Sequence, residues 1–245
     1  MMSNVIELIF GIDSLDALVA ARQSVAALGI ADQRVVRSSL EGLKTEGPPH
    51  FRIEAGAFSI DFSTIKAYQQ QLLVIRKEEP WSFADWESAV EYFLGCDGFT
   101  QACLESEEYT FWQNASDPIQ YEAAGRSCDG LPLVSNGLPS PLNQLVVDTS
   151  KNPGRRVIKV GYVEMVGHVM WLGRPFWGLV GDHRREELLA KSAYQVTELR
   201  NGVVRVVASE NPFVDDTTSE IQDEFRRVLF GVAPFSRTER KAPFA

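Results

Sequence analysis

The sequence predicts an α+β fold with mixed or antiparallel sheets and flanking helices, arranged as two packed halves. Three observations lead to this fold class. The chain opens with a strand pattern that is followed by a helix pattern, a helix with a capping box is predicted over 83–94, and Asn201-Gly202 marks a β-hairpin. Each of these elements has a local physical cause.

The N-terminal elements are a buried strand and a helix. Residues 5–11 form an apolar run that predicts a strand, and Asp13 or Ser14 offers a side-chain oxygen to cap a helix over 15–28. Gly29 can end this helix because glycine readily adopts the left-handed conformation that follows many helix C-termini. Three further strands are predicted from β-branched and aromatic runs at 51–55, 57–62 and 72–77.

The helix predicted over 83–94 has the clearest boundaries. Ser82 and Asp85 have the spacing of a capping box, in which each side chain satisfies a backbone N–H group of the other residue. Glu87 and Glu91 lie four residues apart on the outer side, where their like charges repel each other. The apolar residues recur at helical spacing and define the opposite face: Phe83, Trp86, Ala89, Val90, Phe93 and Leu94.

A segment without helical or strand periodicity predicts the domain boundaries. Residues 125–156 are rich in Gly, Pro, Ser and Asn, which is typical of a long connection over the surface. We therefore expect three parts, namely an N-terminal acidic α/β half at 1–125, a connecting segment at 126–150 and a C-terminal α+β half at 151–245.

The C-terminal half is predicted to contain strands and helices in alternation. Arg174-Pro175 can begin a short helix, because proline is tolerated in the first helical turn. Asn201-Gly202 suits a type I′ turn between two alternating strands. Thr218 or Ser219 can cap a last helix that ends near Phe230.

The charge of the chain is concentrated in one block. The formal net charge is −9, and residues 78–129 contain twelve Asp and Glu residues but only one cation, Arg126. The rest of the chain is therefore slightly positive. Direct binding of nucleic acid is disfavoured, because a phosphate backbone requires a basic surface.

The sequence gives no sign of secretion or of membrane insertion. Residues 1–12 lack the cationic start of a signal peptide and carry Glu7 inside a short apolar run. No run approaches the ~20 apolar residues that span a bilayer. The three cysteines are an odd number in a chain of this length, which favours reduced thiols over disulfides. We expect a cytoplasmic protein without membrane contact.

The known catalytic and cofactor motifs are missing from the sequence. There is no glycine-rich phosphate loop, no dinucleotide-binding turn and no nucleophile elbow. His50, His168 and His183 are scattered, and no two cysteines have the spacing of zinc ligands. The sequence therefore predicts no catalytic residues, no metal and no cofactor, in a protein that is not an enzyme.

Other functional classes stay open from the residues alone. Two of the many carboxylates, held in different environments, would suffice for a hydrolase of the glycosidase type. A small-ligand-binding enzyme that uses His168 with Glu164 is another alternative. The acidic block is also compatible with an ordinary solvated surface that has no partner.

Carboxylates and aromatic residues stand side by side at 95–118, a stretch without Lys or Arg. Soluble surfaces usually mix both signs of charge, whereas a dense field of one sign accelerates the encounter with an oppositely charged partner. Proteins that bind nucleic acid are partners of this kind, because they carry basic clefts that hold the phosphate backbone. We predict an electrostatic contact with a basic partner, with Tyr109 or Trp112 as aromatic anchor and five acids as the charged residues: Glu87, Glu91, Glu105, Glu107 and Glu108.

Two stretches of the chain resemble the bacterial immunity protein 52 family. They are "EEPWSFADWESAVEYF" at 78–93 and "NPGRRVIKVGYVEMVGHVMWLGRPFWGLVG" at 152–181. The resemblance implies a partner that is a nuclease toxin of type VI secretion, with a restriction-endonuclease-like domain. It implies that the protein neutralises this toxin by direct binding in the producing cell. The matching residues are structural in character, so the predicted contact residues rest on charge alone.

Overall fold

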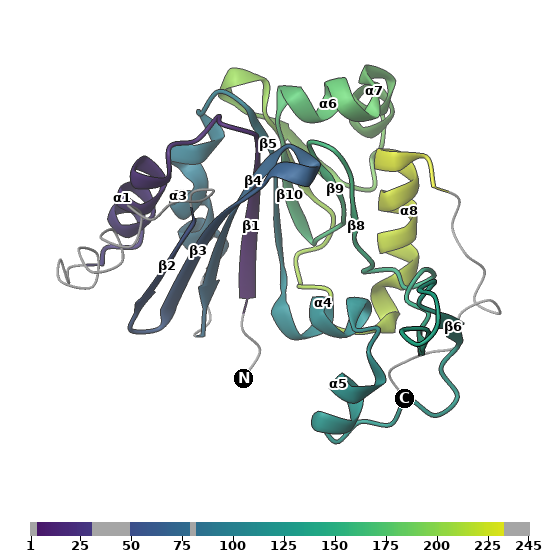
Figure 1. Ribbon diagram of the computed structural model, residues 1–245. Coiled ribbons are helices and arrows are strands. Elements are labelled where there is room, and N and C mark those ends of the chain that lie inside the picture. The colour runs from purple at the N-terminus through teal and green to yellow at the C-terminus, as the bar shows by residue number, and fades with distance from the viewer. Residues whose placement is uncertain (1–3, 31–49, 79–81, 233–245) are drawn as a thin grey trace.

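The described part of the protein is built on one large sheet. The computed structural model describes residues 4–30, 50–78 and 82–232. Within these ranges, eight strands pair antiparallel in the order β11-β12-β10-β5-β1-β4-β3-β2, which confirms the α+β class (Figure 1). The strands are β1 Asn4–Gly11, β2 His50–Ala55, β3 Phe58–Ile65, β4 Gln70–Lys77, β5 Phe99–Ser106, β10 Val169–Leu172, β11 Gln195–Glu198 and β12 Val204–Val207.

Helices cover both faces of this sheet. Two of them pack on one face, α1 Ala17–Ala27 and α3 Phe83–Leu94 (Figure 1). The opposite face is covered by α6 Arg174–Val180, α7 Asp182–Leu189 and α8 Ser219–Phe230. Beyond the end of β5 lie α4 Glu107–Asn114 and α5 Pro118–Ala123. Short 3-10 turns occupy Lys66–Tyr68, Arg200–Gly202 and Asp216–Thr218.

Two small hairpins lie outside the large sheet. The first pairs β6 Leu133–Ser135 with β7 Leu145–Val147, and the second pairs β8 Val157–Ile158 with β9 Val163–Glu164. The first hairpin lies within 125–156, for which the sequence predicted a connection without regular structure, so that prediction was incomplete. The second hairpin lies after this segment. The segment is nevertheless largely exposed, as expected of a surface connection.

The core has two main parts because the central strands are buried on both faces. Successive residues of a strand point to opposite faces, so Ile6, Leu8 and Phe10 pack with α1 and α3. Ile9 packs instead with the layer that contains α6, α7 and α8. This explains why β1 is a nearly continuous apolar run and why every residue of β5 is buried.

Several local predictions are confirmed at the atomic level. Ser82 caps α3, and its side chain and that of Asp85 bond each other's backbone N–H groups at 3.3 and 3.0 Å. The hairpin of β11 and β12 turns at Asn201 and Gly202, whose φ angles of 65° and 75° suit a type I′ turn. The first helix begins later than predicted, because Asp16 and not Asp13 or Ser14 accepts the capping hydrogen bond from the Val19 N–H.

Strands from both predicted halves of the chain join the same sheet. Residue pairs between β5 and β10 link the N-terminal elements directly to the C-terminal ones, with Cys103 opposite Met170. The two halves are therefore joined by backbone hydrogen bonds across the middle of the sheet. Their division at 126–150 stays a prediction.

Candidate functional site

The acidic run of the sequence lies where β5 ends and α4 begins. Ser106 is the last residue of β5 and also the N-cap of α4, where its hydroxyl accepts a hydrogen bond from the Tyr109 N–H at 3.5 Å. Glu107 and Glu108 form the first helical turn, where negative charge interacts favourably with the helix dipole. Local helix formation therefore explains part of this acidic run. Tyr109, Phe111 and Trp112 would favour a strand by propensity, but all three lie in this helix.

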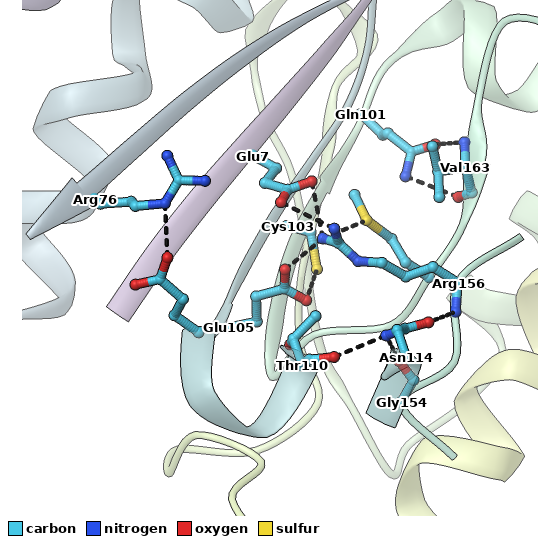
Figure 2. Close-up of polar contacts among 12 residues, drawn as sticks. Glu7, Arg76, Gln101, Cys103, Glu105, Thr110, Asn114, Gly154, Arg156 and Val163 are labelled. Atoms are coloured by element: carbon cyan, nitrogen blue, oxygen red, sulfur yellow. Dashed lines mark hydrogen bonds and ion pairs between the residues drawn. The ribbon is translucent and has the colours of Figure 1, made fainter. Parts of the chain in front are cut away.

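Glu105 is the buried acid of this run. Its side chain is 6% exposed and that of Glu7 is 12% exposed. Both carboxylates contact Nη2 of Arg156, at 2.5 Å for Glu105 and 2.8 Å for Glu7, and Figure 2 shows the guanidinium reaching between them. Glu105 comes from β5, Glu7 from β1, and Arg156 from the residue just before β8. A buried ion-pair cluster therefore joins three distant parts of the chain.

Burial and charge shift the acid-base equilibria of this cluster. Burial raises the pKa of Glu105 to about 7, with Arg156 acting against this shift and Glu7 adding to it. Burial disfavours the charged form of Arg156, but the two carboxylates outweigh it and raise the pKa of Arg156. Burial also raises the pKa of Cys103, whose Sγ atom lies 3.9 Å from Glu105, so this thiol is a poor nucleophile.

We expect Glu105 to lower the stability of the protein as the pH rises towards 7. In the folded chain the pKa of Glu105 is about 7, whereas the ordinary pKa of a glutamate is 4.5. The folded chain therefore keeps the proton of this acid up to a higher pH than the unfolded chain. Between these values the folded state binds more protons than the unfolded state, so the free energy of unfolding falls as pH rises. Glu105→Gln removes the titration. Denaturant unfolding at several pH values should show the variant gaining stability relative to the wild type from about pH 4 to 7.

A matched variant isolates this effect from other titrating groups. Glu108→Gln removes an exposed acid of the same chemical type three residues away. Its stability difference from the wild type should change less with pH. A Glu105→Gln difference that is equally flat would contradict the burial of a titrating acid.

Arginines distant in sequence balance most of the predicted contact acids. Arg76 of β4 bonds Glu107 at 2.7 Å, and it also contacts Asp61 of β3 at 2.5 Å. Arg126 contacts Glu108 at 3.1 Å. On α3, Glu87 contacts Arg205 of β12. The expectation that the acidic block lacks balancing cations is therefore wrong for these acids, because the fold brings arginines to them.

Some acids of the block are exposed without such pairing. Within the ranges that the structure describes, no ion pair reaches four exposed acids: Glu91, Asp97, Glu122 and Asp129. Asp97 precedes β5 and Glu108 follows it, so the length of an eight-residue strand, roughly 25 Å, separates the two ends of the block. The remaining acidic charge is thus divided between the two ends of β5.

The structure does not gather the predicted contact residues into one surface. Glu87 and Glu91 belong to α3, which covers one face of the sheet. Glu105 shares the opposite face with Cys103, since residues two apart in a strand point the same way. Glu107 and Glu108 lie beyond the strand on α4. The five acids therefore fall into three separate groups: Glu87 with Glu91 on α3, Glu105 inside the protein, and Glu107 with Glu108 on α4.

The two predicted aromatic anchors lie inside the protein. The Tyr109 hydroxyl accepts a hydrogen bond from Gln222 Nε2 at 2.8 Å, which ties α4 to α8. Trp112 packs on Tyr121 with ring centroids 5.0 Å apart, in a small core cluster completed by Ala115 and Val147. Direct contact of either ring with a partner stays a prediction. The burial of both rings disfavours such a contact. Phe111, between them on α4, is instead 46% exposed.

A cleft opens between β5, α4 and α5. It has a volume of about 400 Å³, and its walls include Phe111 and the first residues of α5. The charged residues that line it are Glu7, Arg76, Glu105, Glu107, Asp117 and Arg156. Four carboxylates therefore face two arginines, both of which already form ion pairs with these acids. Such a cleft suits a cationic group of an incoming molecule.

The sequence contained weak signals for the parts of this site that its interpretation missed. Glu7 interrupts an apolar run, and an acid in a buried strand requires a cationic partner. Arg156 follows Arg155 at the end of the Gly- and Pro-rich segment 125–156. Neither signal identifies the partner, because Glu7 and Arg156 are 149 positions apart.

Among the described residues, no three His, Cys, Asp or Glu side chains converge as metal ligands. The three cysteines are free thiols. Each helix in the described ranges is too short or too polar to cross a lipid bilayer.

Comparison with known proteins identifies a related fold. The chain is similar to a solved structure described as a T6SS (type VI secretion system) protein of Pseudomonas aeruginosa, PA0821. The match covers 95% of this chain and 73% of that chain, with a TM-score of 0.53 and 14% sequence identity. At this identity the likeness concerns the fold. No protein-family model and no curated protein matches the sequence.

Proposed function

We propose that this protein is an immunity protein, which binds and neutralises a nuclease toxin of the type VI secretion system in the producing cell. The observation that carries the proposal is the acid-lined cleft at the end of β5, together with the acidic helices α4 and α5 beside it. A nuclease needs a basic surface to hold its phosphate backbone substrate. The acidic end of this protein complements such a surface.

The cleft supplies a specific place for a basic side chain of the toxin. Glu107 and Asp117 line it, and the exposed ring of Phe111 forms part of its wall. A lysine or arginine that enters would meet carboxylates and an aromatic face, which attracts cations. Contacts of this kind often dominate the energy of protein interfaces. The likeness to a T6SS protein supports the same biological setting.

The proposal assigns no catalytic activity to the chain itself. The acids of the candidate site hold the fold together through arginine pairs, as for Glu105 with Arg156 and Glu107 with Arg76. An inhibitor requires only a stable surface and a stable fold. The activity of such an inhibitor is therefore measured by its affinity for the toxin and by the protection of cells from the toxin.

Charge reversal at the exposed acids near the cleft tests the proposal. We expect Glu108→Lys/Glu122→Lys to slow association at least 10-fold in low salt, because steering of a basic partner is lost. The difference should shrink at high salt, where the Debye length is short. An immunity gene is expected to lie next to its toxin gene, so the probe is a nuclease domain taken from a neighbouring gene and purified in a catalytically inactive form. Surface plasmon resonance measures both rates.

The other acidic end of the chain offers a matched control. Glu91→Lys/Asp97→Lys makes the same change in net charge at the α3 end, and its association rate should change less. A larger effect of this second variant would place the toxin contact at α3, where Glu91 was predicted from the sequence to be a contact residue. Absence of binding by the wild-type protein, together with no protection of cells from the toxin, would overturn the proposed function.

A carboxylate-based hydrolase is the second candidate, and one observation favours it. Glu7 and Glu105 meet at one arginine beside the cleft, and Glu105 has a pKa of about 7, suitable for a general acid. Against it, Glu105 is buried, the Glu7 side chain is only 12% exposed, and Arg156 holds both carboxylates in ion pairs. Glu105→Gln separates the two functions, because a hydrolase loses its activity whereas an inhibitor keeps its affinity.

A further inference from the structure

The β6–β7 hairpin exposes an unusual number of large apolar side chains. Leu138, Leu142 and Leu145 are 50%, 64% and 60% exposed, and Leu133 and Val134 are also exposed. No charged residue occurs between Asp129 and Asp148. Clustered apolar surface of this kind marks sites of interaction in soluble proteins, whereas single exposed apolar residues do not. In Figure 1 this hairpin lies to the lower right, away from the large sheet.

The loop of this hairpin is held in place by its own hydrogen bonds. The Asn136 side-chain oxygen accepts hydrogen bonds from the N–H groups of Leu138 and Gln144, at 3.1 and 3.3 Å. Its amide nitrogen donates to the Leu142 carbonyl at 2.9 Å. The backbone N–H of Asn136 bonds the Gln144 carbonyl at 2.9 Å. The exposed leucines are therefore carried by an ordered loop, which lowers the entropy lost when a partner binds.

The hairpin is fixed to the acidic helices of the candidate site. Val147 packs in the cluster of Trp112, Ala115 and Tyr121, so β7 rests on α4 and α5. The Val147 N–H also donates to the Ser116 carbonyl at 2.7 Å. Residues 105–148 contain seven acids and one arginine. The apolar tip thus stands beside an acidic surface on the same rigid unit.

We propose that this hairpin is the apolar anchor of the toxin contact, and that Leu138 and Leu142 insert into an apolar groove with a basic rim. This inference rests on the proposed function. It names the apolar residues at the centre of the toxin contact, which the distribution of charge does not identify. Charge complementarity favours a basic protein as the partner that binds the hairpin. A second copy would bring two acidic surfaces together, and anionic lipid headgroups would repel Glu108, Glu122 and Asp129.

Substitution at the tip of the hairpin tests the anchor. Leu138→Ser/Leu142→Ser removes apolar side chains that are at least half exposed in the folded chain, so the unfolding transition should change little. Dissociation of the same inactive nuclease domain should accelerate on the order of 100-fold, with little change in association. Asn136→Ala keeps both leucines but loosens the loop, so it should weaken binding as well.

The β8–β9 hairpin supplies the matched control. Ile158→Ser/Val160→Ser makes the same kind of change at residues that are also exposed, and binding should be unchanged. If the wild type binds and Leu138→Ser/Leu142→Ser binds equally well, the anchor is wrong while the proposed function stands. If the wild type does not bind, the proposed function itself fails.

Two further outcomes would overturn the anchor by naming another occupant. In the first, analytical ultracentrifugation shows that the wild type is a dimer and that Leu138→Ser/Leu142→Ser is a monomer. The hairpin would then contact a second copy of this chain. Sedimentation with vesicles that contain phosphatidylserine would detect membrane binding that the same variant abolishes. A monomeric wild type that leaves such vesicles unbound agrees with the basic protein partner.

Discussion

Arg156→Met should destabilise the protein by about 3–5 kcal/mol, because it leaves the buried carboxylates of Glu7 and Glu105 without their shared cation. The methionine fills a similar volume, so the loss is mainly electrostatic. Without the arginine, ionised Glu105 becomes still less favourable in the folded chain. The destabilisation should therefore be larger at pH 8 than at pH 5, as measured by denaturant unfolding.

A rescue variant separates charge from packing at this position. Adding Glu105→Gln to Arg156→Met removes one of the two unpaired carboxylates, and part of the lost stability should return. Arg22→Met, at an exposed position on α1, controls for the substitution itself and should change stability little. A double variant as unstable as Arg156→Met alone would show that the arginine acts through packing.

Trp112→Ala should cost about 3 kcal/mol, with the damage concentrated in residues 115–148. The indole joins Tyr121 and Val147 in the small cluster on which the β6–β7 hairpin rests, and Arg126 lies over its ring at 4.4 Å. Its removal leaves a cavity between α4, α5 and β7. Hydrogen exchange measured by mass spectrometry should show faster exchange of 115–148, and less change in peptides from the large sheet.

The neighbouring Phe111 provides the control for this prediction. It is an aromatic residue of the same helix but is 46% exposed, so Phe111→Ala should leave the exchange of 115–148 nearly unchanged. Toxin binding should fall in Trp112→Ala, since the hairpin loses its support. Equal loss of protection throughout the large sheet would show that the small cluster does not unfold as a separate unit.

Elements with complete local signals could be predicted from sequence. The capping box of Ser82 and Asp85 and the apolar face behind it define α3 without any distant contact. Asn201-Gly202 likewise defines its turn, because both residues tolerate positive φ. These signals lie within a few residues of the structure they specify.

Other elements were missed because local signals competed. Tyr109, Phe111 and Trp112 favour strands by propensity, yet Ser106 as N-cap and two glutamates in the first turn favour a helix. The helix is the observed outcome. The β6 and β7 strands have three residues each, too few for a period to be recognised among prolines and glycines.

The candidate site depends on long-range contacts that no local pattern contains. Glu105 and Arg156 are 51 positions apart. The sequence showed an excess of acid at 78–129 but not that arginines at 76, 156 and 205 reach into it. Charge counted along a chain therefore overstated the charge available at the surface, and the pairing of strands decided which acids stay free.

During translation, β5 emerges from the ribosome well before β10, its neighbour on one side in the sheet. Until β10 follows, the nascent chain carries a central strand with one edge open to pairing with other chains. A product truncated within 126–150 would keep this open edge and would tend to aggregate. Under the proposed function, protection from the toxin would therefore begin only after synthesis has passed β10, and the timing of translation would be part of how a producing cell survives.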